Sequence, residues 1–263
     1  MISNPFDLTG KVAFITGAAS GLGFAMAEAF VEQGATVAMA DIDAEGLRRS
    51  TGRLSQAGFN AMAVDLDVRE PLRIREAINE VARQHGGLDI CCANAGITGG
   101  PPFSRPEGEI ENVDLGIWDN VVKINQTGVF ATMQAAAAVM KPRKSGRIIV
   151  TCSISGLLTG AISGYAYSAT KAAVIHLVRV AAVELAPHNI LVNGFAPGPF
   201  MTNIAGGRLF REPETVDFMA STVPLKRVAE PSELKGLALL LASGASSYIT
   251  GAIIPIDGGA TAM

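Results

Sequence analysis

The sequence predicts a doubly wound α/β fold, in which a seven-stranded parallel sheet carries helices on both faces. Seven short apolar runs alternate with longer amphipathic segments, a pattern typical of parallel strands that are covered on both sides. The chain is 49% hydrophobic and 17% charged, which supplies a large core and excludes a disordered chain. We therefore expect one domain over residues 1–263. The predicted strands are 11–17, 35–41, 60–68, 88–96, 146–153, 189–198 and 251–259.

The first strand ends in a glycine-rich stretch, TGAASGLG at 16–23, which leads directly into a helix-like segment. Gly17, Gly21 and Gly23 would let the backbone turn tightly and approach a ligand, with phosphates at the positive end of the helix. Taken alone, such a stretch is equally consistent with a plain tight turn. Its place between the first strand and the first helix favours dinucleotide binding.

The second strand ends in Asp41, 18 residues after Gly23, where a carboxylate can accept hydrogen bonds from both hydroxyls of an adenosine ribose. Asp41 would repel a 2′-phosphate, and neither Ser20 nor Ile42 is a cation that could offset the repulsion. The alternative role of a helix N-cap suits Asp43 better. The sequence therefore favours NAD over NADP.

The stretch GYAYSATKAAV, at 164–174, holds two of the three tyrosines, Tyr165 and Tyr167. Only Tyr167 has a lysine four residues later, Lys171, and positions i and i+4 share one face of a helix. A neighbouring ammonium lowers the pKa of a phenol, so Tyr167 could take a proton from an alcohol or give one to a carbonyl. Tyr165 lacks such a partner, and we interpret it as a packing or pocket-wall residue.

With the glycine pattern TGxxxGxG and the YxxxK pair in this order, the chain resembles the short-chain dehydrogenase/reductase family over nearly its whole length. The resemblance implies a Rossmann fold and hydride transfer between a nicotinamide cofactor and a secondary alcohol or ketone. It assigns catalytic roles to Tyr167, Lys171 and Asn125, the last as the residue that kinks a helix and anchors a proton-relay water. Together with the glycine loop and Asp41, it implies a cofactor site made of Gly17, Ser20, Gly21, Leu22, Gly23, Asp41, Ile42, Asp67, Val68, Asn94, Ala95, Gly96, Tyr167, Lys171, Pro197, Gly198, Phe200 and Thr202.

Two serines at the end of the fifth strand are candidates for the catalytic serine of this family. Ser153 stands three residues before Gly156, as in the family pattern, but one residue farther from Tyr167 than is usual. An insertion within LLTGAISGYA would account for the extra residue. Ser155 is one residue too close to Tyr167, and its other possible role is to line the pocket. We predict Ser153, because backbone geometry fixes the strand end whereas a following loop absorbs an extra residue.

The charge and hydropathy of the chain limit the kinds of partner that it could bind. The net charge of −3 and the pI of about 5.7 disfavour nucleic-acid and anionic membrane surfaces, so we expect a small-molecule substrate. No run of 18 apolar residues could span a bilayer, and the first residues lack the pattern of a signal peptide. We expect a cytoplasmic protein.

Cysteines and histidines give no sign of a metal site. Cys91, Cys92 and Cys152 are odd in number, so we predict reduced core residues rather than a disulfide framework. The three histidines have no partner cysteines at metal-ligand spacing, which disfavours a zinc-dependent alcohol dehydrogenase. We interpret them as structural or surface residues; they are His85, His176 and His188.

Four segments suggest how the chain assembles and what surrounds its substrate. Segments 128–140 and 169–185 are apolar or small-residued around most of their circumference, and the family commonly pairs such helices, so we predict a homotetramer. The segment 199–223 carries Phe200, Phe210 and Met219 among its apolar residues, and we predict that it forms a substrate lid. The loop 96–112 is expected to be a surface excursion near the site.

The overall pattern is similar to enzymes that act on sugar acids and polyols, such as gluconate 5-dehydrogenases. A 3-oxoacyl-carrier-protein reductase is an alternative with the same scaffold, but such enzymes usually prefer NADP and often carry basic residues for an acidic carrier. Asp41 and the acidic balance count against it. A non-catalytic NAD-binding scaffold protein is the second alternative, because a fold does not prove activity.

Overall fold

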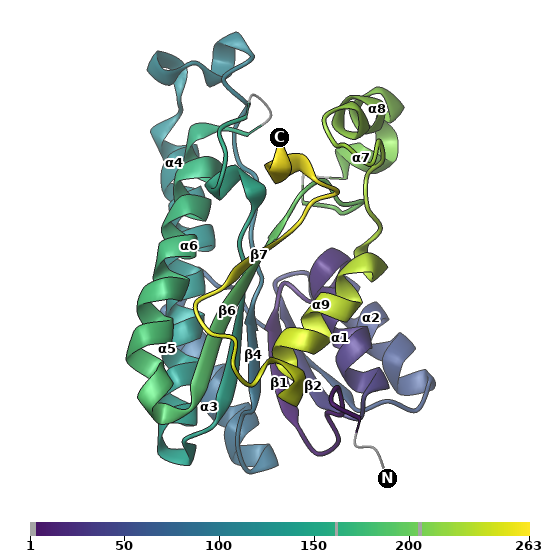
Figure 1. The fold of residues 1–263 in the computed structure, drawn as a ribbon, viewed down its shortest axis with the longest axis vertical. Coiled ribbons are helices and arrows are strands. Elements are labelled where there is room, and N and C mark those ends of the chain that lie inside the picture. Colours follow the sequence, from purple (N-terminus) through teal and green to yellow (C-terminus); the bar gives the residue numbers. More distant parts are fainter. Residues whose placement is uncertain (1–3, 161–162, 205–206) are drawn as a thin grey trace.

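The computed structural model describes residues 4–160, 163–204 and 207–263. Its seven strands form one parallel sheet in the order β3-β2-β1-β4-β5-β6-β7, which confirms the predicted fold class (Figure 1). The strands are β1 (Val12–Thr16), β2 (Thr36–Asp41), β3 (Ala61–Asp65), β4 (Ile90–Ala93), β5 (Gly146–Thr151), β6 (Ile190–Pro197) and β7 (Ile253–Ile256).

Helices follow the strands and cover both faces of the sheet (Figure 1). The α-helices are α1 (Gly21–Glu32), α2 (Ala44–Gln56), α3 (Pro71–His85), α4 (Leu115–Val122), α5 (Val129–Met140), α6 (Tyr165–Leu185), α7 (Arg208–Arg211), α8 (Pro213–Ser221) and α9 (Lys235–Ala242). A π-helical segment, η3 (Lys123–Gly128), joins α4 to α5. The short 3₁₀ turn η5 (Ile154–Gly156) follows β5. No helix in the described ranges is long and apolar enough to cross a membrane.

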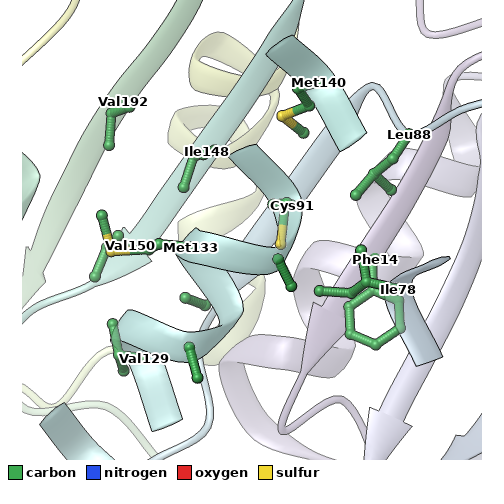
Figure 2. Close-up of a cluster of buried hydrophobic side chains, with 14 of the residues drawn as sticks. Phe14, Ile78, Leu88, Cys91, Val129, Met133, Met140, Ile148, Val150 and Val192 are labelled. Carbon is green, nitrogen blue, oxygen red and sulfur yellow. The ribbon is translucent and has the colours of Figure 1, made fainter. Parts of the chain in front are cut away.

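The sheet separates two apolar clusters. Alternate residues of β1 point to opposite faces, so that Phe14 belongs to the cluster under α3, α5 and α6, while Ile15 belongs to the cluster under α1, α2 and α9. Figure 2 shows the first cluster, with Phe14 beside Ile78 and Cys91. All three cysteines are buried and free, as predicted. Both clusters are continuous under the strands, which fixes the sheet as a rigid base for the loops at its edge.

The strand order reverses between β1 and β4. The chain runs from β1 outward to β2 and β3, and then returns to β4 on the other side of β1. The loops that follow β1 and β4 therefore leave the sheet in opposite directions, and ligands of doubly wound sheets bind in the crevice that this creates at the carboxyl ends of the strands.

The segment predicted as a lid stands partly outside these layers. Helices α7 and α8 lie beyond the carboxyl edge of the sheet (Figure 1). Phe210 and Phe218 are exposed, but Phe200 is buried, bridges to Ala229 and belongs to the apolar cluster under α1 and α9. Phe200 is therefore an anchor of the segment, not part of a mobile surface. Two residues of the predicted lid, 205–206, and two of the predicted insertion, 161–162, lie outside the described residues.

Candidate active site

A cavity of about 570 Å³ opens at the carboxyl edge of the sheet. Residues at or just beyond the ends of five strands line it, namely Gly17, Asp41, Asn94, Ser153 and Pro197. Every residue that the sequence predicted for the site lines this cavity, except Asn125. The volume lies within the range typical of cofactor and small-molecule sites.

Glycines allow the loop after β1 to pass close to its neighbours. Gly17 has a φ of +67°, and a Cβ there would lie 2.9 Å from the Cα atom of Ala95. A Cβ on Gly23 would collide with the carbonyl oxygen of Gly17. Helix α1 begins at Gly21, after an extended Ser20, so its first unpaired N–H groups lie at the cavity wall. This arrangement suits a bound phosphate.

Asp41 is held at the cavity wall by the backbone. Its Oδ2 atom accepts a hydrogen bond from the Ala19 N–H (2.9 Å), and its Oδ1 atom accepts one from the Asp43 N–H (3.0 Å). Each oxygen keeps a lone pair for a ligand hydroxyl. Asp43 itself caps α2 by accepting from the Gly46 N–H (2.9 Å), which confirms the expected division of roles. The loop and this carboxylate fit the diphosphate and ribose of a dinucleotide.

An arginine that the sequence reasoning did not consider also lines the cavity. The Arg69 guanidinium donates from Nη2 to Asp67 Oδ2 (2.6 Å) and from Nε to the same oxygen (2.9 Å). These hydrogen bonds lower the pKa of the Asp67 carboxyl. Arg69 follows Asp67 by two residues, so the sequence offered a signal, but only the geometry shows that the guanidinium is already engaged.

Asn94 ties together the ends of three strands. Its Nδ2 atom donates to the carbonyl oxygens of Thr16 (2.9 Å) and Gly17 (3.1 Å), while its Oδ1 atom accepts from the Thr151 hydroxyl (2.8 Å). The loops after β1, β4 and β5 are therefore fixed relative to one another.

Tyr167 and Lys171 lie one turn apart near the start of α6. Lys171 is only 2% exposed, and its Nζ donates to the Thr151 carbonyl oxygen (2.8 Å) while lying 5.7 Å from the centre of the Tyr167 ring. Burial lowers the pKa of Lys171 to about 8. The i, i+4 spacing thus brings the two side chains together, as predicted from the sequence.

The pKa of the Tyr167 hydroxyl is not lowered by Lys171 in the chain without a cofactor. Burial raises the pKa of the Tyr167 hydroxyl, and a hydrogen bond with Ser153 only partly opposes this effect. The Lys171 ammonium donates to the Thr151 carbonyl oxygen, and among the described residues it makes no hydrogen bond with the Tyr167 hydroxyl. The prediction of a lowered pKa was therefore wrong for this state, because desolvation is the larger effect.

The two candidate serines make different contacts. The Ser153 side chain is buried, hydrogen-bonds with Tyr167 and accepts from the Ser155 N–H (3.1 Å). The Ser155 hydroxyl instead lies 2.8 Å from the Ser163 hydroxyl. A Cβ on Gly156 would lie 2.6 Å from the Lys171 carbonyl oxygen, so only glycine lets the turn after β5 pack this tightly on α6. The structure brings Ser153, and not Ser155, to Tyr167.

Asn125 lies behind the cavity wall in the π-helical segment. It is fully buried, its Nδ2 atom donates to the Ile97 carbonyl oxygen (2.8 Å), and its Oδ1 atom accepts from the Ile97 N–H (2.9 Å). A Cβ on Gly96 would lie 3.3 Å from that Oδ1 atom and 3.7 Å from Lys171 Nζ. Asn125 therefore fixes the loop after β4 next to the lysine.

Residues from several loops and from helices α4 and α8 complete the cavity, and the sequence reasoning did not assign them to the site one by one, although it placed Met219 in the predicted lid. They have no short motif, and only folding brings them together; they include Thr98, Asn120, Ile154, Ser163, Asn203, Ile204 and Met219. Tyr165 points elsewhere, with its ring 6.3 Å from that of Phe103, in a smaller cavity of about 240 Å³. Within the described ranges, no group of three His, Cys, Asp or Glu residues could hold a metal ion.

The chain is similar to known proteins over most of its length. Residues 17–261 match a family model described as enoyl-(acyl carrier protein) reductase. A 5-keto-D-gluconate 5-reductase of Escherichia coli is 37% identical over 255 residues, which cover 97% of this chain and 96% of that protein. A short-chain type dehydrogenase/reductase from Mycobacterium marinum superposes with a TM-score of 0.91 at 38% identity, covering 98% of both chains. A candidate NAD(P)-dependent gluconate 5-dehydrogenase from Beutenbergia cavernae, solved with NADP at low occupancy, has a TM-score of 0.90 at 31% identity and covers 99% of this chain and 100% of that one.

Proposed function

This chain belongs to the short-chain dehydrogenase/reductase family, and we propose that it is an NAD-dependent member that interconverts a secondary alcohol and a ketone, with Tyr167 as general acid and base. The family comprises oxidoreductases that act on CH–OH groups with a nicotinamide cofactor. The observation that carries the proposal is the contact of Tyr167 with Ser153 and Lys171 on the wall of the cavity that Asp41 and the glycine loop also line.

Tyr167 would be the residue that moves the proton. Because burial raises the pKa of its hydroxyl, Tyr167 is protonated at neutral pH, which is the state that donates to a carbonyl during reduction. When a substrate is bound, the Ser153 hydroxyl would turn its one proton from Tyr167 to the substrate oxygen on which charge develops. When bound, a nicotinamide cofactor supplies or accepts the hydride, which is the chemistry of the cofactor itself.

Lys171 and Asn125 support this arrangement. Lys171, with its pKa lowered to about 8, is still mainly protonated at neutral pH and could hold a ribose hydroxyl of the cofactor beside Tyr167. The Asn125 amide donates one hydrogen bond to the Ile97 backbone and accepts one from it, so it would act by holding the loop that carries Gly96 against Lys171. The proton-relay role that the family implies for Asn125 stays a prediction.

The choice of NAD rests on Asp41 and on the state of the nearby arginine. Asp41 keeps lone pairs for two ribose hydroxyls, and its charge would repel a 2′-phosphate. Arg69 is the one cation beside this end of the cavity among the described lining residues, and its guanidinium is paired with Asp67. Two of its nitrogens, Nε and Nη2, are held by Asp67, and the Asp67 carboxylate would itself repel a 2′-phosphate.

Lid and assembly remain proposals that follow from the same placement. Met219 of α8 lines the cavity, so the segment 199–223 could cover a bound substrate. On the outer faces of α5 and α6, Phe130, Val180 and Val183 are exposed, and a homotetramer that pairs these helices would bury them. Sedimentation analysis would test the assembly, and a monomer would contradict it.

The proposed function is tested by following NADH formation with a broad panel of secondary alcohols, and NADH consumption with the matching ketones. We expect turnover with both, and loss of turnover in the Tyr167→Phe variant. A 3-oxoacyl thioester belongs in the panel, since the matched family model carries the name of an acyl-carrier-protein reductase. Turnover of the thioester alone would favour that alternative, and NADH binding without any turnover would favour a non-catalytic protein.

A further inference from the structure

We infer that the substrate is an uncharged compound with a second hydroxyl close to the reacting carbon, such as a polyol or a hydroxyketone, recognised by the Ser155 and Ser163 pair. This inference rests on the proposed function, because it concerns the substrate of the same site. Two independent features of the cavity carry it: a pair of hydroxyls beside the reacting groups, and the distance of the charged residues from that pair.

The Ser155 and Ser163 hydroxyls meet on the cavity wall, with 2.8 Å between their Oγ atoms. The Ser155 N–H donates to Ser153 Oγ (3.1 Å), and Ser153 hydrogen-bonds with Tyr167, so the pair lies next to the position of the reacting oxygen. Each hydroxyl has one proton, and a pair that uses one proton internally keeps the other, together with lone pairs, for a ligand. Such a pair can donate to a substrate hydroxyl and also accept from it.

The charged side chains of the cavity lie elsewhere or are engaged. Of the described lining residues, the charged ones are Asp41, Asp67, Arg69 and Lys171. Asp41 ends β2, which is separated from β5, the strand that leads to Ser153, by β1 and β4. Three strand spacings of about 4.8 Å put some 14 Å between them. Asp67 and Arg69, which follow the still more distant β3, pair with each other.

Lys171 is the cation nearest the serine pair among the described residues that line the cavity, and one of its protons is held by the backbone. Its Nζ donates to the Thr151 carbonyl oxygen, and burial lowers its pKa to about 8. Apart from the four charged residues, the described side chains that line the cavity are apolar or uncharged, and they include Ile154, Asn203 and Ile204. A carboxylate placed there would lose its hydration without gaining a paired cation, which disfavours its binding, whereas a hydroxyl would find both a donor and an acceptor.

The test compares two matched substrate pairs under NAD-linked oxidation. Sorbitol and gluconate differ at one carbon by an alcohol against a carboxylate, and 1,2-cyclohexanediol and cyclohexanol differ by the second hydroxyl. We expect kcat/KM to be at least about 10-fold higher for sorbitol than for gluconate, and for the diol than for cyclohexanol, because unpaired or missing hydrogen bonds at a built site reduce turnover by such factors. Ser155→Ala and Ser163→Ala should each remove most of the preference for the diol.

The controls separate recognition from damage to the fold. In both serine variants the kcat/KM for cyclohexanol should stay within about 3-fold of the wild-type value. Ser247 is an exposed serine far from the cavity, and in Ser247→Ala the kcat/KM should stay within the same range for both cyclic substrates. Equal losses with the diol and with cyclohexanol would indicate a structural role for the pair and overturn the inference. A kcat/KM that is higher for gluconate than for sorbitol, and that falls in Arg211→Met, would also overturn the inference. It would show that Arg211 of α7 binds the substrate carboxylate. Turnover of no alcohol at all would overturn the proposed function, and the inference with it.

Discussion

The two ends of the cavity are built differently. At the end formed by β1, β2 and β3, the backbone fixes the groups that face a ligand. At the end formed by β5 and β6, the groups that face a ligand are side chains from several separate elements. Two backbone N–H groups hold the Asp41 carboxylate, one from Ala19 in the loop after β1 and one from Asp43 in its own loop, and Gly23 packs directly on Gly17. At the other end, Ser153 follows β5, Tyr167 lies on α6 and Met219 lies on α8. The first end depends on local geometry, and the second depends on how distant elements pack.

This difference indicates where each kind of substitution should act. Changes at the β1–β3 end should alter cofactor affinity and choice, with the rate of the chemical step preserved. Changes to the reacting side chains of the β5–β6 end, Ser153 and Tyr167, should alter turnover, with cofactor affinity preserved.

The largest expected effect is that of Tyr167→Phe. Losing the proton donor should lower kcat by about 10²- to 10⁴-fold, because general acid–base catalysis contributes factors of that size. NADH affinity, measured by fluorescence titration, should stay nearly unchanged. Tyr165→Phe is the matched control. This variant should retain activity, because the Tyr165 ring lies against Phe103. A reversal of the two results would show that the wrong tyrosine has been assigned.

Next in size is Ser153→Ala, which should lower kcat by about 10²- to 10³-fold through loss of a donor to the developing oxyanion. Ser155→Ala should mainly raise the KM of substrates that carry a second hydroxyl, because Ser155 pairs with Ser163 instead of Tyr167. Steady-state kinetics of both variants with one good substrate distinguishes the two serines. An inactive Ser155→Ala beside an active Ser153→Ala would overturn the assignment.

At the other end of the cavity, Asp41→Ala should narrow the preference for NAD over NADP by about 10- to 100-fold, the factor expected when charge-assisted hydrogen bonds are lost. The fall should come mainly from weaker use of NAD, with little change in kcat at saturating cofactor. The ratio of kcat/KM values for NAD and NADP is the measurement. Equal efficiency of the wild type with both cofactors would contradict the choice of NAD.

Two glycine variants test whether backbone packing holds this end. Gly23→Ala should lower the free energy of unfolding by about 1–3 kcal/mol and weaken NADH binding, because its Cβ would collide with the Gly17 carbonyl oxygen. Gly52→Ala, in α2, meets nothing within 4 Å and should raise the free energy of unfolding by up to about 1 kcal/mol. Urea unfolding of both variants is the test, and equal stability of the two would show that the loop can relax.

The smallest expected effect concerns pH. Burial lowers the pKa of Lys171 from 10.5 to about 8, so below pH 8 the folded chain holds a buried charge that disfavours folding, and this penalty falls as the pH rises toward 10.5. Relative to Lys171→Met, the wild type should therefore gain about 1 kcal/mol in free energy of unfolding between pH 7 and pH 9. Cys91 and Cys92 have raised pKa values and the opposite trend, but they are present in both proteins. A constant difference between the two proteins would show that Lys171 does not titrate in this range.

Local patterns in the sequence determined which segments form the strands and which residues form the cofactor end of the cavity. Apolar runs identified the strands, and the glycine spacing with Asp41 identified a dinucleotide loop, because a tight turn, a helix start and a strand end are all made by neighbouring residues. The YxxxK spacing placed Tyr167 and Lys171 on one helix face for the same reason.

Tertiary structure alone decided the contacts that connect separate elements. Burial reversed the expected shift in the pKa of Tyr167, since desolvation depends on everything packed around the phenol and not on one neighbour in the chain. The Ser155 and Ser163 pair spans eight positions in the sequence, and the Lys171 to Thr151 hydrogen bond spans twenty. Such contacts carry no local signal, because a hydroxyl or a backbone carbonyl acquires a role only when folding places another group within about 3 Å of it.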